Sequence, residues 1–191
     1  MEQTPLTVRR WSRFEYEKLV DTGFFEGDHV ELIAGQLIVA EPQGSYHATV
    51  VSIVCDSLRR LLPAGWVVRE EKPIALDDES APEPDIVVVP GVHEDYLNAH
   101  PGVPSLAIEV ADSSLRFDRR LKASAYARGR IADYWIVNVT ERQLEVYRDP
   151  VPDANEALGH RYASRTDLKA GASVSPLARP AASVAVSELL P

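Results

Sequence analysis

The hydrophobic positions of this chain follow helical spacing in some segments and strand spacing in others, which predicts a protein of mixed α/β class. Helical spacing predicts amphipathic helices over about 7–20, 44–62 and 116–129. Short apolar or alternating runs predict strands over 66–76, 85–89, 105–111, 134–139 and 143–147. Two further strands over 30–39 are expected to form a hairpin that turns at Ala34 and Gly35. The alternation of strands and helices indicates a central mixed sheet flanked by helices.

The two ends of the chain are expected to add to this core. Thr7 is the candidate cap of the first helix. The segments 91–104 and 149–159 are typical of loops, and the Pro- and Ala-rich tail is expected to add edge strands and a final turn at 187–190. A length of 191 residues fits one domain. We expect its core over about 7–148 and a C-terminal extension over about 149–191.

The composition excludes several classes of protein. Hydrophobic residues at 45% and charged residues at 26% are typical of a globular chain and argue against disorder. The chain has no apolar stretch long enough to span a bilayer, and its first residues lack the apolar block of a signal peptide. We therefore expect a cytoplasmic protein with no membrane association. Cys55, the one cysteine, cannot form an internal disulfide and is expected to be a buried hydrophobe.

The net charge of −9 is unusual for a protein that binds phosphates. The basic residues, however, are concentrated in one predicted helix: the segment 116–130 holds six of them and a single acidic residue. We therefore consider Arg116, Arg119 and Arg120 as candidates to contact a nucleic acid. A solvated helix face is the alternative for most of these arginines.

Two acidic residues interrupt apolar strands and are the first candidates for chemistry. Asp85 opens one strand behind a proline, and Glu109 lies in the middle of another. Burial of an unpaired carboxylate costs several kcal/mol, a cost that a bound cation offsets. Neighbouring strands lie about 4.8 Å apart, so the two side chains could reach one ion. Paired or edge-exposed carboxylates are the alternative for each acid taken alone.

Lys122 is the candidate for a catalytic ammonium group, because hydrolysis needs a positioned water and a partner for developing negative charge. It shares a predicted helix face with Asp118 and Tyr126, four residues away on either side. The alternative is a lysine that extends over the edge of the core. Glu31 interrupts an apolar strand in the same way as Glu109. His47 lies on the apolar face of its helix, where a core histidine is the commoner interpretation.

Several segments, in this order along the chain, resemble the Uma-type putative restriction endonuclease family of the PD-(D/E)XK superfamily. These segments are 30–38, 45–47, 84–89, 106–110, 118–126 and 133–137. The resemblance extends from about residue 7 to 148. It implies the restriction-endonuclease-like fold, which is a mixed four-stranded sheet with flanking helices.

The same resemblance implies a Mg²⁺-dependent nuclease site, in which Mn²⁺ is expected to substitute. Carried over residue by residue, that site is Glu31, Asp85 and Glu109 as the acids, with Lys122 as the catalytic lysine. His47 is a further residue of the family pattern, and Asp118 and Tyr126 are accessory candidates.

This sequence departs from the pattern at two points. Ala111 stands where the superfamily usually has its lysine, so that role would pass to Lys122. The residues 111–114 read Ala-Asp-Ser-Ser, where family members commonly have a Ser-Pro turn.

Two functions are therefore open. The first is a metal-dependent DNA endonuclease, expected to be a homodimer because cutting both strands of a duplex usually takes two sites. The second is a catalytically inactive member of the fold that binds nucleic acid or protein. A metal site at His93 and His100 is a weaker idea, because their spacing fits no common ligand pattern.

Overall fold

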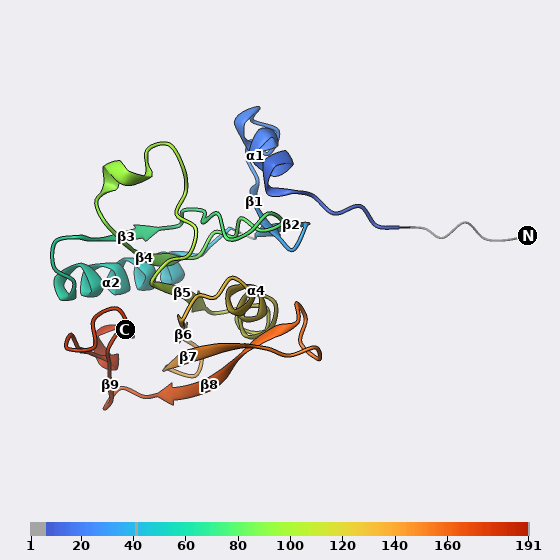
Figure 1. Ribbon diagram of the computed structural model, residues 1–191. Helices are drawn as coiled ribbons and strands as arrows, with labels where there is room; N and C mark the ends of the chain where they lie inside the picture. The colour runs from blue at the N-terminus through green and yellow to red at the C-terminus, as the bar shows by residue number, and fades with distance from the viewer. Residues whose placement is uncertain (1–6, 41, 191) are drawn as a thin grey trace, which may run out of the picture.

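A six-stranded mixed sheet forms the centre of the computed structural model, which describes residues 7–40 and 42–190 (Figure 1). In sheet order its strands are β3 (Trp66–Glu70), β4 (Ile86–Pro90), β5 (Leu106–Ala111), β6 (Asp133–Asn138), β7 (Gln143–Pro152) and β8 (His160–Leu168). Only β5 and β6 pair in parallel, and the other neighbours are antiparallel. The predicted mixed sheet with flanking helices is confirmed.

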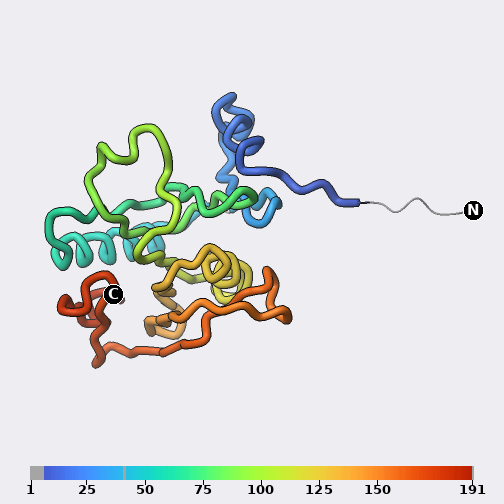
Figure 2. Tube along the Cα trace, viewed as in Figure 1, coloured from blue at the N-terminus to red at the C-terminus, as the bar shows by residue number. Residues whose placement is uncertain are grey.

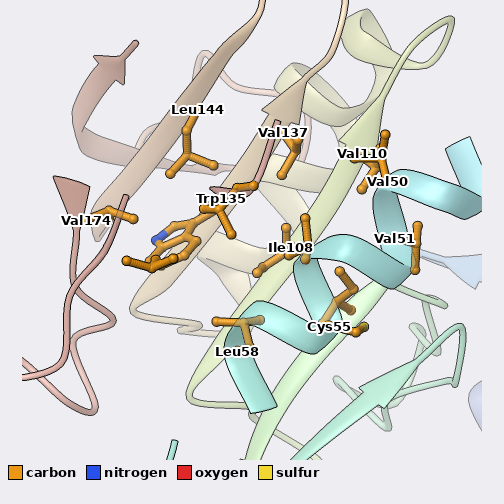
Figure 3. Close-up of a cluster of buried hydrophobic side chains, with 14 of the residues drawn as sticks. Val50, Val51, Cys55, Leu58, Ile108, Val110, Trp135, Val137, Leu144 and Val174 are labelled. Atoms are coloured by element: carbon orange, nitrogen blue, oxygen red, sulfur yellow. The ribbon is translucent and has the colours of Figure 1, made fainter. Parts of the chain in front are cut away.

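Helix α2 (Ser45–Leu61) covers one face of this sheet. Its apolar face contacts the strand residues that point to that side, and Cys55 is buried among them as expected. Figure 3 shows the main contributors, which are Val50, Val51, Cys55 and Leu58 of α2 with Ile108, Val110, Trp135, Val137 and Leu144 of the sheet. Even-numbered residues of β5 face this cluster, so the odd-numbered residues, Glu109 included, face the other side of the sheet.

The opposite face is covered by the helical crossover between β5 and β6. It consists of α3 (Leu115–Phe117), a π-helical turn (Asp118–Lys122) and α4 (Ala123–Arg128). The prediction of a helix over 116–129 therefore holds in position, although a π-turn widens its middle. Small alanines and Tyr126 of this crossover belong to one buried cluster with Ala107 and Ala111 of β5 and with Tyr134 and Ile136 of β6.

The N-terminal part consists of α1 (Arg13–Asp21) and a hairpin of β1 (His29–Ile33) and β2 (Gln36–Ala40). The hairpin turns at Ala34 and Gly35, as predicted, and both have positive φ angles, of 49° and 74°. The predicted cap at Thr7 is wrong. The helix begins at Arg13, because Ser12 and Glu15 form a reciprocal capping box.

The tail differs from prediction because strand pairing extends further than the local pattern indicates. β7 continues to Pro152, which pairs with His160 of β8, so the expected loop at 149–159 begins only after Pro152. Of the edge strands expected after residue 159, β8 does form an edge of the main sheet, whereas β9 (Ser173–Val174) and β10 (Val184–Ala185) pair with each other. A short 3₁₀ turn, η3 (Val186–Glu188), follows them. Figure 2 shows how this last segment returns to α2, where Leu189 and Leu190 are buried.

Two other segments are shorter or more ordered than predicted. Regular pairing of the expected strand over 66–76 ends at Glu70. The loop over 91–104 contains a 3₁₀ turn, η1 (His93–Tyr96). Residues 1–6, on which the expectation about a signal peptide rests, lie outside the described residues. Across 7–40 and 42–190, no helix has the length and apolar character needed to cross a membrane.

Candidate functional site

Asp85 directly precedes β4, and Glu109 lies on β5, the antiparallel neighbour of β4 in the central sheet. Ile86 of β4 pairs with Ile108 of β5, so the next step of the register places Asp85 opposite Glu109. Opposite residues of an antiparallel pair point to the same face. Their exposed fractions are only 7% and 2%, and both side chains line one cavity of about 390 Å³.

Side chains from three other elements line the same cavity. They are Glu31 of β1, His47 of α2, and Asp118 and Lys122 of the crossover. The hairpin, the start of α2, the crossover and the sheet thus meet at one point. The structure brings together all seven residues that the sequence singled out as catalytic or accessory, since Tyr126 contacts Glu109 directly.

Lys122 links two of the acids. Its Nζ lies 3.1 Å from Oε1 of Glu109 and 3.6 Å from Oε1 of Glu31, and its side chain is 9% exposed. Burial alone would lower the pKa of Lys122, but the carboxylates of Glu109 and Glu31 outweigh it and raise that pKa. The side chain is therefore an ammonium ion throughout the neutral range.

Asp85 is held by three groups. The main-chain N–H of Val110 donates to Oδ2 at 2.7 Å, and Nε2 of Gln43 donates to Oδ1 at 3.1 Å. Nε2 of His47 lies 3.2 Å from Oδ1, an ionic contact without good hydrogen-bond alignment. Burial alone would raise the pKa of Asp85, but His47 and the charge of Lys122 outweigh it and lower that pKa. Asp85 is therefore a carboxylate.

Contact with Asp85 also acts on His47. Burial alone would lower the pKa of His47, but the adjacent carboxylate raises it above its usual value. Gln43 is a site residue that the sequence did not reveal, because it lies in a connection between β2 and α2 and carries no charge or periodic signal of its own.

Glu109 has a different environment from Asp85. The hydroxyl of Tyr126 donates to its Oε1 at 2.5 Å, the same oxygen that faces Lys122. Burial raises the pKa of Glu109 well above its usual value, although the charge of Lys122 opposes this. Glu31 is fixed separately, because its Oε2 accepts the main-chain N–H of Glu83 at 3.0 Å.

Asp118 is a further acidic residue of the lining. It is 2% exposed, and the hydroxyl of Ser114 donates to its Oδ2 at 2.5 Å. Burial raises the pKa of Asp118 to about 6, while Lys122 acts in the opposite direction. Ser114 lies in the tetrapeptide that replaces the Ser-Pro turn of the family pattern.

The cavity has the donors that a hard divalent cation prefers. Within 7–40 and 42–190, no three His, Cys, Asp or Glu side chains form a complete ligand set. Mg²⁺ commonly binds through one or two carboxylates with waters and phosphate oxygens as its other ligands, so a complete protein set is not required. Five carboxylates line the cavity, those of Glu31, Asp85, Glu109, Asp112 and Asp118, and the ammonium group of Lys122 contacts two of them. Asp85 and Glu109 fit a cation of this type.

The three arginines considered for nucleic-acid binding lie in two different environments. Arg119 forms a paired contact with Glu145, at 3.0 Å from Nε and 2.5 Å from Nη2, so its guanidinium is occupied. Arg116 and Arg120 are exposed and form no ion pair with any described residue. The idea of a metal site at His93 and His100 receives no support, because no metal-binding group of His, Cys, Asp and Glu side chains is found among the described residues and Nδ1 of His100 lies beside the guanidinium of Arg69.

Comparison with known proteins agrees with this architecture. A family model described as "Uma2: Putative restriction endonuclease" matches residues 14–185. A crystal structure of a putative nuclease belonging to DUF820, from Anabaena variabilis ATCC 29413, is similar with a TM-score of 0.67 at 15% identity, over 94% of this chain and 97% of that chain. At this identity the likeness shows the fold, which is restriction-endonuclease-like. No curated protein matches the chain.

Proposed function

Because the chain belongs to the Uma2 family of putative restriction endonucleases, we propose that it is a metal-dependent endonuclease that hydrolyses phosphodiester bonds of DNA. Family membership supports a nuclease in general terms. The observation that carries the finer proposal is the convergence of Asp85, Glu109 and Lys122 on one buried cavity. In a structural ion-pair network of the core, the acids would have no reason to face an open volume.

In this proposal Asp85 and Glu109 hold a Mg²⁺ ion, for which Mn²⁺ can substitute. When bound, such an ion lowers the pKa of a coordinated water and offsets the charge of the phosphate. Glu31, whose Oε1 lies 3.6 Å from Nζ of Lys122, contributes to the negative potential that attracts the cation. The environments of the two acids differ in a way that suits cation binding. Asp85 is already a carboxylate, whereas the pKa of Glu109 is raised, so a nearby cation would favour its ionised form most.

Lys122 acts as an ammonium ion and not as a base, since its pKa is raised. An ammonium group beside the scissile phosphate would stabilise the negative charge that develops on the phosphate oxygens, and could orient the attacking water. The crossover therefore supplies from a helix the positive charge that the superfamily usually supplies from the strand. Ala111, at the usual position, is fully buried in the core instead.

The remaining residues position the acids. Tyr126 fixes Glu109, and Gln43 and His47 fix Asp85, so that both carboxylates keep their orientation before a cation binds. Asp118 adds to the negative charge that keeps Lys122 protonated. A homodimer and a cytoplasmic location belong to the same proposal.

The test is a cleavage assay on circular DNA, in duplex and in single-stranded form, with Mg²⁺ or Mn²⁺. We expect cleavage that ends with a chelator and falls at least about 100-fold in Asp85→Asn and Glu109→Gln, as for loss of a group that acts in the transition state. Glu141→Gln is the matched control, because this half-exposed carboxylate does not line the cavity. Absence of cleavage of both DNA forms would refute the proposal and favour the inactive binding module. Full activity in both site variants would refute the assignment of the site to Asp85 and Glu109.

A further inference from the structure

The candidate catalytic groups are buried deeply for a site that would act on a double helix. The exposed fractions of Glu31, Asp85, Glu109 and Lys122 are 6%, 7%, 2% and 8%. The cavity above them, about 390 Å³, has the volume of a pocket for one small molecule. The backbone of a continuous duplex is attached to stacked base pairs along its length, so it cannot enter a cavity of this size.

The end of the hairpin and the start of α2 form one wall of this cavity, which is partly open to solvent. Val39 and Ala40 of β2, with Pro42 and Gln43 after it, contribute to this wall, and residues of the crossover contribute to another. A phosphate that contacts Lys122 has to enter between these walls. A single extended strand can do this, because its backbone is free of a partner strand.

A shallow groove leads away from the cavity along the crossover. It is about 400 Å³ in volume and shares Ser113, Ser114 and Phe117 with the cavity, so the two are continuous. Beyond these residues Arg116 and Arg120 line the groove. An aromatic ring beside free guanidinium groups is the combination that binds single strands, since bases stack on the ring and phosphates contact the arginines.

The distribution of charge also favours a single strand. Of the six basic residues over 116–130, Lys122 contacts Glu109, Arg119 contacts Glu145, and Arg128 contacts Asp77 at 2.6 Å. Arg130 is exposed and, like Arg116 and Arg120, forms no ion pair with a described residue. Few positive charges thus remain to neutralise phosphates, on a protein of net charge −9. Duplex DNA carries one charge per about 1.7 Å of its axis and takes many phosphate contacts to bind, whereas a short single strand carries fewer charges.

We propose that the substrate is single-stranded nucleic acid, which lies along the groove of Arg116, Phe117 and Arg120 and passes one phosphodiester into the cavity. This proposal rests on the proposed nuclease function and specifies its substrate. The proposal includes unpaired segments within a duplex, because their backbone is also free of a partner strand.

The cleavage arm of the test compares labelled oligonucleotides of one sequence: a single strand of DNA, its RNA counterpart, the full duplex, and the duplex with an unpaired central segment. We expect the DNA single strand and the unpaired segment to be cut at least about 10-fold faster than the full duplex. Cleavage of the RNA strand at a similar rate would also support the proposal. Equal or faster cutting of the full duplex would overturn it while leaving the nuclease function intact, and no cleavage of any substrate would remove both.

The binding arm needs no metal and no turnover. Fluorescence anisotropy in a chelator is expected to show weaker binding of the DNA single strand, by about 10-fold or more, in the double variant Arg116→Ala, Arg120→Ala. The salt dependence of its log affinity should be shallower by about 1.4, at about 0.7 per lost phosphate contact on a single strand. Phe117→Leu keeps an apolar side chain without a ring for stacking and should weaken binding about 5-fold.

Arg179→Ala is the control, an exposed arginine on the C-terminal segment and not part of the groove. Unfolding curves of all variants separate loss of binding from loss of structure. Wild-type affinity in the folded double arginine variant, or an equal loss in the control, would overturn the proposed path of the strand.

Discussion

Glu145 allows a sharp test of which charged groups stabilise the fold and which serve the site. The side chain is fully buried on β7 and is surrounded by donors. Arg119 binds both of its oxygens, Asn138 and Tyr147 each donate one hydrogen bond, and Arg165 lies 3.3 Å away. Burial alone would raise the pKa of Glu145, but the hydrogen bonds from Arg119 and its neighbours outweigh it and lower that pKa from 4.5 to about 2.

The lowering of the pKa of Glu145 sets the size of the expected loss of stability when this carboxylate is removed. At about 1.4 kcal/mol per pKa unit, it corresponds to about 3 kcal/mol of the free energy of unfolding at pH 7. The folded-state pKa is lowered, so this contribution is complete above about pH 4.5 and is lost as the pH falls through about 2. At pH 3 about 1.4 kcal/mol should remain, by the same linkage relation.

The perturbation is Glu145→Gln, and the assay is urea unfolding at pH 7 and at pH 3. We expect the variant to be less stable than wild type by about 3 kcal/mol at pH 7, and the gap to narrow to about half at pH 3. Glu141→Gln, which also removes a partner of Arg119 but is 49% exposed, should lose no more than about 0.5 kcal/mol. A gap that is equal at the two pH values would refute the reasoning. Lost nucleic-acid cleavage in a variant that is still folded would also refute it, because it would give Arg119 a functional role.

Three further predictions concern the site and its support. Tyr126→Phe removes the hydroxyl that orients Glu109, and we expect turnover to fall about 10-fold or more with about 1–2 kcal/mol lost from the free energy of unfolding, checked by cleavage kinetics and urea unfolding. Mg²⁺ at 10 mM should stabilise wild type by about 1.4 kcal/mol for a Kd of about 1 mM, seen as a rise in Tm of about 3–6 °C that is absent in Asp85→Asn. Leu189→Ala should cost about 2–5 kcal/mol in urea unfolding with cleavage retained in the folded protein, because this fully buried residue packs on the face of the sheet opposite the site.

The sequence predicted those parts of the fold that local patterns determine. The β-branched run of β4 and the apolar face of α2 could be recognised in the sequence. Side chains that are buried on one face of a strand or helix recur with the period of that element, so their spacing predicts it. The acids Asp85 and Glu109 could be detected because a charged residue interrupts an apolar run that otherwise predicts burial. The resemblance implied that these acids converge with Lys122, but the distances between them depend on how the strands and the crossover pack.

The contacts that the sequence did not reveal are those between distant segments. Arg119 and Glu145 lie far apart in the chain, so no local pattern indicates that this arginine is occupied and unlike Arg116. Gln43 and Ser114 contact Asp85 and Asp118 from connections, where no periodicity constrains a side chain. The extension of β7 beyond Asp149 was missed for the same reason, because its pairing with β8 stabilises residues with weak strand propensity.

The position of the lysine follows from the packing of the crossover on the sheet. Ala111 follows Glu109 by two residues and points to the same face, and there it is fully buried in one cluster with Ala123 and Ala125 of the crossover. These small side chains let the helical segment lie close to β5, which leaves no volume for a lysine at residue 111. The same close approach brings Lys122 to 3.1 Å from Glu109. The ammonium group thus reaches Glu109 from the helix because the strand position is filled, and the proposed chemistry depends on where this charge lies in space and not on where it stands in the chain.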